Sequence, residues 1–340
     1  MNNMIPRRTA LAMALGAGSG AAFSQQKPAR AVPATKGAAA PAWPTRPVHI
    51  LVGFPGGSTP DLVARTIAEP LSRALGQPVI VENKPGAGGN IAADGVVKST
   101  DDHTIGVMIN GNMTIAKMLN AATPYDPLKD LAPISLIGTA PLLLTAPANA
   151  PGANAQEFFV NARNAGNKWS YGSPGIGTVG HIGMELLKTR TNINPVHVPY
   201  PGNPQVINAM ISGQIQLALL PPGLAAAQIR AGKLRAIGVT SPARSPLVPE
   251  YPSLDEAGVT RGFQLEIWTA AAAPVSMPKP IVAKLSSLIA EIARTPEVRQ
   301  KLFQQGWQVA GTSSEGLANR IKSDTALLGG IIQMRGIKAE

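Results

Sequence analysis

Residues 48–83 read VHILVGFPGGSTPDLVARTIAEPLSRALGQPVIVEN, and this stretch decides the fold class. One apolar run opens it and a second closes it, and both contain the Val and Ile residues that favour strands. Between them, a Gly-rich turn leads into a segment whose apolar residues recur with the spacing of one helix face. The order strand, helix, strand predicts a parallel sheet that is covered by helices.

The same alternation continues along the rest of the chain. Strands are predicted at 48–54, 78–83, 103–109, 168–173, 195–200, 214–220, 234–240 and 263–274. Helices are predicted at 58–76, 89–99, 178–190, 203–212, 222–231, 279–293, 296–304 and 314–335. Only helices follow the last, long apolar strand. We therefore expect the chain to cross back there and to pack these helices on the first of two lobes.

The N-terminal segments differ in composition from the rest of the chain. Residues 1–24 contain an arginine pair and then a short uncharged run rich in Ala and Leu, which is typical of an export signal and too short to span a membrane. The pair suggests twin-arginine export, but Pro6 and Ala10 fit that motif poorly, so the general and the twin-arginine routes both stay open. Residues 25–42 are rich in Pro and Ala, as in a flexible tether. We expect lobe 1 at 43–145 and 253–340, and lobe 2 at 146–252.

The charge and composition exclude several classes of function. The formal net charge is +11, and removing the predicted signal leaves 28 basic against 19 acidic residues, a net charge of +9. The basic residues are scattered and aromatic residues make up only 4% of the chain, which argues against nucleic-acid binding. Diffuse positive charge suits small anionic ligands, or simply keeps the protein in solution. Because the chain has no cysteine, disulfides, thiol chemistry and a lipid-modified cysteine anchor are excluded.

One motif suggests a cofactor. Residues 175–180 read GIGTVG, which matches the dinucleotide-binding pattern G-x-G-x-x-G. That pattern is meaningful when a strand precedes it, a helix follows it and an acidic residue about 20 positions later binds the ribose. The strand and the helix are predicted, but no Asp or Glu occurs between Glu185 and Glu250. We therefore expect no cofactor, and a dinucleotide-dependent enzyme is the less favoured alternative.

Five segments, in this order, resemble the substrate-binding receptors of tripartite tricarboxylate transporters, often called Bug-type receptors. They are ILVGFPGGSTPDLVAR at 50–65, VIVENKPGAGGN at 79–90, YGSPGIGT at 171–178, HVPYPG at 197–202 and IRAGKLRAIGVT at 229–240. The similarity extends from about residue 43 to the C-terminus. It implies an α/β fold of the two-lobed periplasmic binding protein class (type II-like), with a mainly parallel sheet flanked by helices in each lobe and the ligand cleft between the lobes.

The resemblance also implies where the ligand binds. In these receptors, the loops that match Pro55–Thr59 and Ser173–Thr178 hold a carboxylate of the ligand. The predicted ligand-binding residues are Phe54, Pro55, Gly56, Gly57, Ser58, Thr59, Asn110, Ser173, Gly175, Gly177, Thr178, Tyr200, Leu220 and Pro221. No catalytic residue, metal or cofactor is implied.

The chemistry of the two loops agrees with this prediction. Each is a Gly-rich turn from a strand end into a helix start, where free N–H groups and the helix dipole favour an anion. Glycines that let the backbone approach a ligand occupy positions 56, 57, 175 and 177. Hydroxyl donors are added by Ser58, Thr59, Ser173 and Thr178. For either loop alone, an ordinary tight turn with a helix cap is the alternative.

Other polar residues have weaker links to a ligand. Asp61 is interpreted as a helix-start residue, and the PGAGGN segment at 85–90 as either a structural turn or a binding loop. Asn110 follows the third strand and should face the cleft, where it either contacts the ligand or caps a turn. His181 and Glu185 are the only histidine and carboxylate spaced four apart that are able to share a metal. Such a lone pair is usually a packing or surface contact.

The sequence departs from the family pattern in the predicted second lobe. Where these receptors commonly carry an Asp-Asn pair after a strand, this chain has Leu220 and Pro221, and Gln216 replaces a frequent acidic residue. A ligand amine would therefore lack a charged partner, and an unpaired buried charge costs several kcal/mol. Amino acids are disfavoured, and a carboxylate with an apolar or aromatic remainder is favoured.

These observations predict a solute-binding receptor in the periplasm and not an enzyme. Its expected partners are a small organic acid and the integral membrane permease subunits that receive it, and we expect a monomer. A receptor-fold sensor that pairs with a membrane signalling protein is the main alternative.

Overall fold

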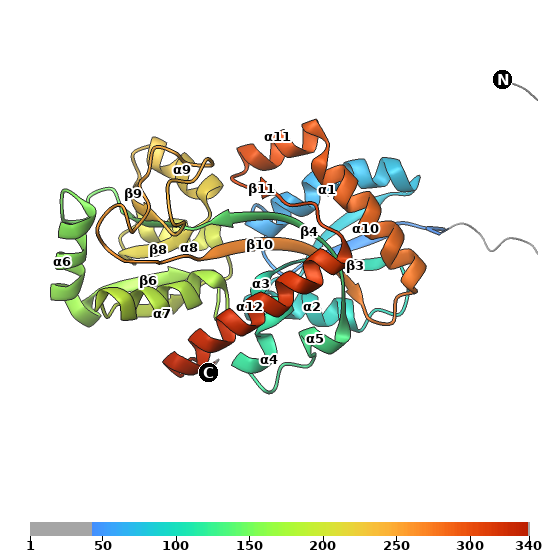
Figure 1. The fold of residues 1–340 in the computed structure, drawn as a ribbon, viewed down its shortest axis with the longest axis horizontal. Helices are drawn as coiled ribbons and strands as arrows, with labels where there is room; N and C mark the ends of the chain where they lie inside the picture. Colours follow the sequence, from blue (N-terminus) through green and yellow to red (C-terminus); the bar gives the residue numbers. More distant parts are fainter. Residues whose placement is uncertain (1–42, 339–340) are drawn as a thin grey trace, which may run out of the picture. The chain divides into compact units, whose positions relative to one another are not determined.

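Two mixed β-sheets with helices on both faces make up residues 43–338, which the computed structural model describes (Figure 1). These residues all belong to one unit of the chain. The predicted signal at 1–24 and tether at 25–42 lie outside the described residues. Among the described helices, none is long and apolar enough to cross a membrane.

The first sheet has the strand order β11-β4-β10-β3-β1-β2. Its strands are β1 Val48–Val52, β2 Val79–Asn83, β3 Thr104–Ile109, β4 Leu131–Pro141, β10 Glu266–Pro274 and β11 Gln308–Val309. β1 pairs in parallel with β2 and β3, whereas β10 lies antiparallel between β3 and β4. The chain therefore returns to the first sheet through β10, as predicted.

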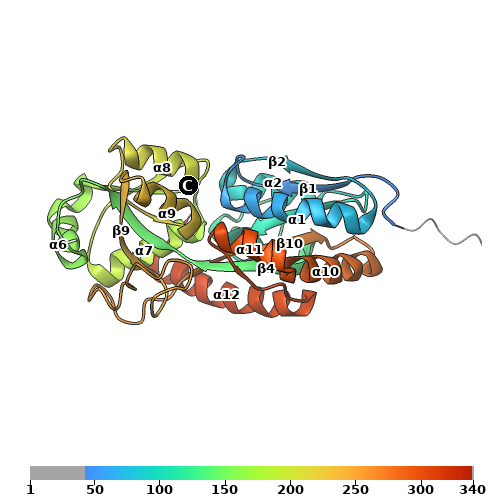
Figure 2. The same ribbon diagram turned by 90° about the horizontal axis from the view of Figure 1, so that it is seen from above.

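The second sheet has the strand order β7-β6-β8-β5-β9. Its strands are β5 Leu143–Pro147, β6 Ser170–Ser173, β7 Val196–Pro199, β8 Leu217–Leu220 and β9 Leu234–Val239. β6 pairs in parallel with β7 and β8, whereas β5 is antiparallel to β8 and β9. Only Leu142 separates β4 from β5, so the chain passes directly from one sheet into the other (Figure 2).

Helices account for most of the remaining sequence. They are α1 Thr59–Leu75, α2 Asn90–Val97, α3 Asn110–Thr114, α4 Ala116–Leu119, α5 Pro127–Asp130, α6 Ala155–Ala165, α7 Val179–Thr191, α8 Asn203–Ile211, α9 Pro222–Arg230, α10 Lys279–Arg294, α11 Pro296–Gln304 and α12 Ser314–Arg335.

The first helix shows how local chemistry sets the ends. Pro60 fits the first turn, where an N–H group has no intrahelical partner. Gly76 ends the helix at φ 69°, and its N–H donates to the Ser72 carbonyl at 3.0 Å.

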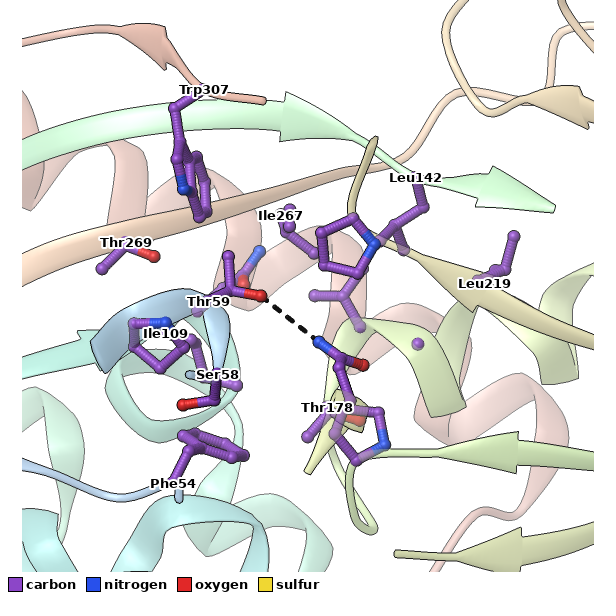
Figure 3. A pocket seen from close by; sticks show the side chains of 17 residues that line it. Phe54, Ser58, Thr59, Ile109, Leu142, Thr178, Leu219, Ile267, Thr269 and Trp307 are labelled. Atoms are coloured by element: carbon purple, nitrogen blue, oxygen red, sulfur yellow. Dashed lines mark hydrogen bonds between the residues drawn. The ribbon is translucent and has the colours of Figure 1, made fainter. Parts of the chain in front are cut away.

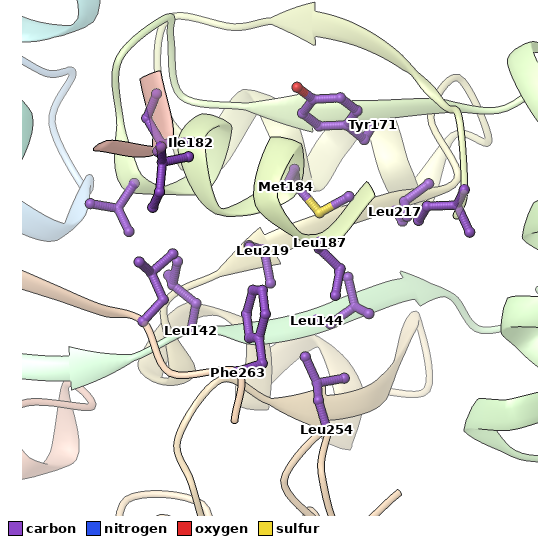
Figure 4. Close-up of a cluster of buried hydrophobic side chains, with 14 of the residues drawn as sticks. Leu142, Leu144, Tyr171, Ile182, Met184, Leu187, Leu217, Leu219, Leu254 and Phe263 are labelled. Carbon is purple, nitrogen blue, oxygen red and sulfur yellow. The ribbon is translucent and has the colours of Figure 1, made fainter. Parts of the chain in front are cut away.

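Alternating strand residues divide the core between the two faces of each sheet. Ile50 and Val52 pack with α1, α10 and α11, and Leu51 packs with α2 and α12 on the opposite face. In the second sheet, Leu217 and Leu219 pack with α7, as Figure 4 shows, while α8 and α9 cover the other face. Because burial of one such side chain contributes about 1.5–3 kcal/mol, this alternation fixes the register of the strands.

The structure confirms the predicted α/β class, and every predicted element occurs within three residues of its expected ends. Most strands of each sheet run in one direction, and the exceptions are β10 and β11 in the first sheet and β5 in the second. The strands β4, β5 and β11 and the helices α3, α4, α5 and α6 were not predicted. Pro133 and Pro141 lie within β4, where proline interrupts the usual strand pattern.

Candidate ligand-binding site

A small cavity lies between the two sheets, where strand ends lead into helices (Figure 3). It leaves about 40 Å³ open to the centre of a water molecule, which is room for a few waters or a very small ligand. Elements of the first sheet contribute Phe54, Ser58, Thr59, Pro60, Ile109, Asn110, Ile267, Thr269 and Trp307. The remaining lining residues are Leu142, Pro174, Thr178, Val179, Gly180, Asn203, Leu219 and Pro221.

Four helices begin at this cavity. α1 starts at Thr59, α7 at Val179 and α8 at Asn203, all of which line it, and α9 starts directly after the lining residue Pro221. N–H groups in the first turn of a helix have no intrahelical acceptor, and the helix dipole adds partial positive charge there. The four helix starts therefore favour an anion without the help of a basic side chain.

Three buried polar atoms at the cavity have no hydrogen-bond partner among the described residues: Ser58 Oγ, Asn203 Oδ1 and Thr269 Oγ1. These residues are 1%, 7% and 0% exposed. A buried polar atom left without a partner costs about 1–3 kcal/mol, so a polar ligand that bonds to these atoms is favoured. Asn203 Nδ2 donates to Thr59 Oγ1 at 3.3 Å and so joins the start of α8 to the start of α1 (Figure 3).

The rest of the cavity wall is largely apolar. Leu142, Leu219, Ile267 and Trp307 lie along it, as Figure 3 shows. No Lys, Arg, His, Asp or Glu side chain of the described chain lines the cavity. A charged group placed against this wall would be buried without a partner, at a cost of several kcal/mol.

The loop Pro55–Thr59 is held by a carboxylate. Asp61 Oδ2 accepts the Gly57 N–H at 2.9 Å, while Oδ1 accepts from Arg65 at 3.0 Å and from Asn83 at 2.9 Å. Burial opposes ionisation, but these hydrogen bonds lower the pKa of the Asp61 carboxyl group overall. Asp61 therefore supports the start of α1, in agreement with the sequence interpretation, and it does not line the cavity.

The loop Ser173–Thr178 is held by contacts within itself. The hydroxyl group of Thr178 donates to the Gly175 carbonyl at 2.7 Å, and Ser173 Oγ accepts the Gly175 N–H at 3.3 Å. Gly175 has φ +122°, and a Cβ atom there would lie 3.0 Å from the Cα of Gly88. Glycine is thus required both by the backbone angle and by the close approach of the 85–90 segment.

The predicted ligand-binding residues fall into two groups in the structure. Six of them line the cavity: Phe54, Ser58, Thr59, Asn110, Thr178 and Pro221. The others lie outside its lining: Pro55, Gly56, Gly57, Ser173, Gly175, Gly177, Tyr200 and Leu220. Gly175 and Tyr200 instead line a neighbouring groove beside the 85–90 segment, and Leu220 packs in the core of the second sheet. Which of them contacts a ligand stays a prediction.

Asn110 is engaged with the protein itself. Its Nδ2 donates to the Glu266 carbonyl at 3.0 Å, and its Oδ1 accepts the Trp268 N–H at 3.5 Å. The side chain thus ties the start of α3 to the backbone of β10. This contact supports the structural interpretation of Asn110, although the residue borders the cavity.

Sequence reasoning missed several lining residues, and three of them have chemical consequences. Asn203 and Thr269 bring two of the unpartnered polar atoms, and Trp307 brings the largest side chain. The start of a predicted helix was the only sequence signal for Asn203. Thr269 lies in a predicted core strand, and Trp307 lies between two predicted helices where no element was predicted, so the sequence carried no signal for them.

No group of three or more His, Asp or Glu residues within 43–338 is placed to hold a metal. The predicted pair His181 and Glu185 has other contacts: Glu185 accepts the Tyr171 hydroxyl at 2.6 Å and pairs with Lys188 at 2.9 Å. These contacts agree with the interpretation of the pair as a packing contact.

Comparisons with known proteins agree with the geometry. The family model described as tripartite tricarboxylate transporter family receptor matches residues 63–337. A UPF0065 protein from the tcbD-tcbE intergenic region of Pseudomonas sp. (strain P51) is 34% identical over 285 residues, which cover 84% of each chain.

Two solved structures of Rhodopseudomonas palustris proteins are also similar. MatC, with bound malate, is 31% identical with a TM-score of 0.81, and the match covers 85% of this chain and 100% of MatC. Rpa4515, with adipate, is 29% identical with a TM-score of 0.82, and the match covers 87% of this chain and 99% of Rpa4515. The two-lobed fold of periplasmic binding proteins is thereby confirmed. The chain belongs to the tripartite tricarboxylate transporter receptor family, whose members are solute-binding proteins.

Proposed function

We propose that this chain is an exported periplasmic receptor that captures a small organic carboxylate between its two lobes and delivers it to membrane permease subunits. The observation that carries this proposal is the meeting of four helix starts at one cavity that contains unpartnered polar atoms. The lobes proposed are 43–145 with 253–340, and 146–252. The bound malate and adipate of two relatives support a carboxylate ligand.

A carboxylate fits the donors at the cavity. The first turns of α1 and α7 offer main-chain N–H groups, and Ser58 and Thr269 offer hydroxyl groups that lack a partner. Asn203 can present its amide nitrogen instead of Oδ1 if the side-chain amide turns over, because the Thr59 hydroxyl can then donate to the oxygen. Hydrogen bonds to a charged acceptor contribute about 1.5–3 kcal/mol each, roughly twice the neutral value.

The cavity wall indicates what the rest of the ligand is like. Pro221 occupies the wall, and Leu220 packs behind it in the core, so neither supplies a partner for an amine. Leu142, Leu219 and Ile267 instead offer apolar contact. We therefore propose a short carboxylic acid whose remainder is uncharged and apolar, and we expect amino acids to bind poorly.

Thermal unfolding in the presence of single compounds tests the proposal. The panel contains butyrate, malate, adipate, alanine and NAD, each at several concentrations. A ligand at 100 times its dissociation constant stabilises the folded state by about 2.7 kcal/mol, which gives a clear rise in melting temperature. We expect a rise with at least one carboxylate, butyrate first. A rise with NAD and with none of the acids would overturn the proposal.

A further inference from the structure

Three aromatic rings, those of the buried Tyr171 and His181 and of the half-buried His197, form a stack behind the loop Ser173–Thr178. The ring of Tyr171 lies 4.8 Å from that of His197, which in turn lies 4.2 Å from the ring of His181, and the planes are inclined by 21° and 15°. Tyr171 is 0% exposed and His181 is 6% exposed. Neither histidine lines the cavity, and neither has a role in the proposed binding of the ligand.

Each imidazole makes a hydrogen bond to the loop. His181 Nδ1 accepts the Gly177 N–H at 3.2 Å, and His197 Nε2 lies 2.7 Å from the hydroxyl oxygen of Ser173. A nitrogen that accepts an N–H group carries no proton itself, so the His181 imidazole is neutral with its proton on Nε2. The two rings thus hold the first residue of the loop and the residue just before Thr178.

The surroundings favour neutral imidazoles. Burial lowers the pKa of His181 to about 4, although the nearby Glu185 carboxylate acts in the opposite direction. Burial and the neighbouring His181 ring lower the pKa of His197 to about 3. Lys188 also disfavours a second positive charge there. Glu185 is itself paired with Lys188 at 2.9 Å and with Arg335 of α12 at 3.5 Å, so its charge is already balanced.

We propose that His181 and His197 are positioning residues, which as neutral imidazoles fix the loop Ser173–Thr178 in its binding conformation. The bond to His181 directs the Gly177 N–H away from the cavity. The N–H groups of the first turn of α7, at Val179 and Gly180, then remain for the ligand. This inference rests on the proposed binding of a carboxylate at that helix start.

Matched substitutions separate the hydrogen bond from the packing of the ring. In His181→Asn, the amide oxygen lies close to the position of Nδ1 and keeps an acceptor for Gly177, whereas His181→Leu fills similar space without one. His197→Gln and His197→Leu form the corresponding pair for Ser173. His103→Leu is the control for loss of a buried histidine, because His103 lies beside Asp101 and makes no hydrogen bond to the loop.

Two measurements are made on each folded variant: the affinity for the tightest-binding of butyrate, malate and adipate, and the hydrogen exchange rate of the Gly177 amide without ligand. We expect His181→Leu to bind at least tenfold more weakly and its Gly177 amide to exchange at least tenfold faster. His181→Asn should stay within about threefold of the parent in both, and His103→Leu should bind like the parent. For the second pair, His197→Leu should bind at least tenfold more weakly and His197→Gln within threefold.

The proposal is overturned if either Leu variant binds like the parent, or if an Asn or Gln variant is impaired as much as its Leu partner. If NAD binds the parent and none of the three acids does, the proposed function fails, and the exchange rates alone then decide the role of His181. If a Leu variant does not fold, nitrogen NMR of the parent imidazoles at pH 7 decides. An unprotonated Nδ1 on His181 supports the proposal, and a proton on that atom overturns it.

Discussion

The loops Pro55–Thr59 and Ser173–Thr178 are alike in sequence but differ in how the protein holds them. In the first, Gly56 and Gly57 are exposed with open space beside them, and the loop is fixed by the ionised carboxylate of Asp61. The second is mostly buried, and neutral imidazoles contact it from behind. Two helix starts that face one cavity are thus positioned by different chemistry.

The difference has an electrostatic consequence. The charge of Asp61 opposes a ligand anion and is offset by Arg65, which lies 3.0 Å away. The imidazoles of His181 and His197 bring no charge. We therefore expect the same kind of change, made in each loop, to have different effects on binding and stability.

Valine in place of glycine should give the largest contrast. Gly175→Val places a branched side chain at φ +122° and against the backbone of Gly88, so we expect binding to fall by more than a hundredfold. In Gly57→Val, the added Cβ atom meets no atom within 4 Å. The only cost is therefore that of the backbone angle of +77°, about 1–3 kcal/mol. Calorimetry with the acid that binds the parent, alongside circular dichroism, checks both variants. Near-parent affinity of a folded Gly175→Val protein would contradict the packing argument.

Asparagine in place of Asp61 and of His181 should reduce stability by different amounts. Asp61→Asn loses the charge that accepts from Gly57, Arg65 and Asn83, and we expect the free energy of unfolding to drop by about 1.5–3 kcal/mol. His181→Asn keeps an acceptor and should cost less than about 1 kcal/mol. Urea unfolding at pH 7 compares the two. Equal losses would mean that the loops are held in the same way after all.

The residues that hold the two loops should lose their contributions to stability in different pH ranges. His181 and His197 have pKa values lowered to about 4 and about 3, so below about pH 6.5 the unfolded chain binds protons that the folded protein does not. The contribution of the imidazoles to the free energy of unfolding should therefore be complete above pH 6.5. It should decrease as the pH falls toward 4, by up to about 1.4 kcal/mol per pH unit for each imidazole. Because the pKa of Asp61 is lowered from 3.8, its contribution is lost only as the pH falls below that value.

Urea unfolding at pH 7, 6 and 5 measures this slope. The slope should decrease in His181→Asn and stay unchanged in Asp61→Asn. A parent protein whose stability is flat over this range would show that the imidazoles are not buried in their neutral form.

The smallest expected effects concern single hydroxyl groups. Ser58 Oγ has no partner among the described residues, so Ser58→Ala should leave stability unchanged and weaken ligand binding about tenfold. The Thr178 hydroxyl donates within its loop, so Thr178→Ala should reduce stability by about 1 kcal/mol and affect binding less. Thermal unfolding with and without ligand tests both. If the Ser58→Ala variant kept the full affinity for the ligand, the ligand would have to bind elsewhere.

Local chemistry made most of the fold predictable. Pro60 and Gly76 mark the two ends of α1, and the spacing of Val63, Ile67 and Leu71 marks its buried face. β4 and β5 escaped prediction because LAPISLIGTAPLLLTAP is almost uniformly apolar, without the alternation that identifies a strand. Such a run reads the same in a buried strand as in a buried helix.

The candidate site was predictable only in part, since it is assembled from distant segments. The Gly-rich turns at Ser58 and Thr178 carry a local signal, because strand-to-helix turns have a recognisable composition. Thr269 lies among alanines of a core strand, and nothing local shows that its hydroxyl lacks a partner. The orientation of Asn110 toward β10 likewise depends on the pairing of strands far apart in the chain.

The place of β10 between β3 and β4 has a consequence for how the chain matures during synthesis. β3 and β4 are made first, and the strand that joins them appears only after the whole second sheet has been synthesised. Until then both strands have an unpaired edge, which slows folding through high contact order and exposes sites for aggregation. A nascent chain truncated before Glu266 should therefore be unable to close its first sheet.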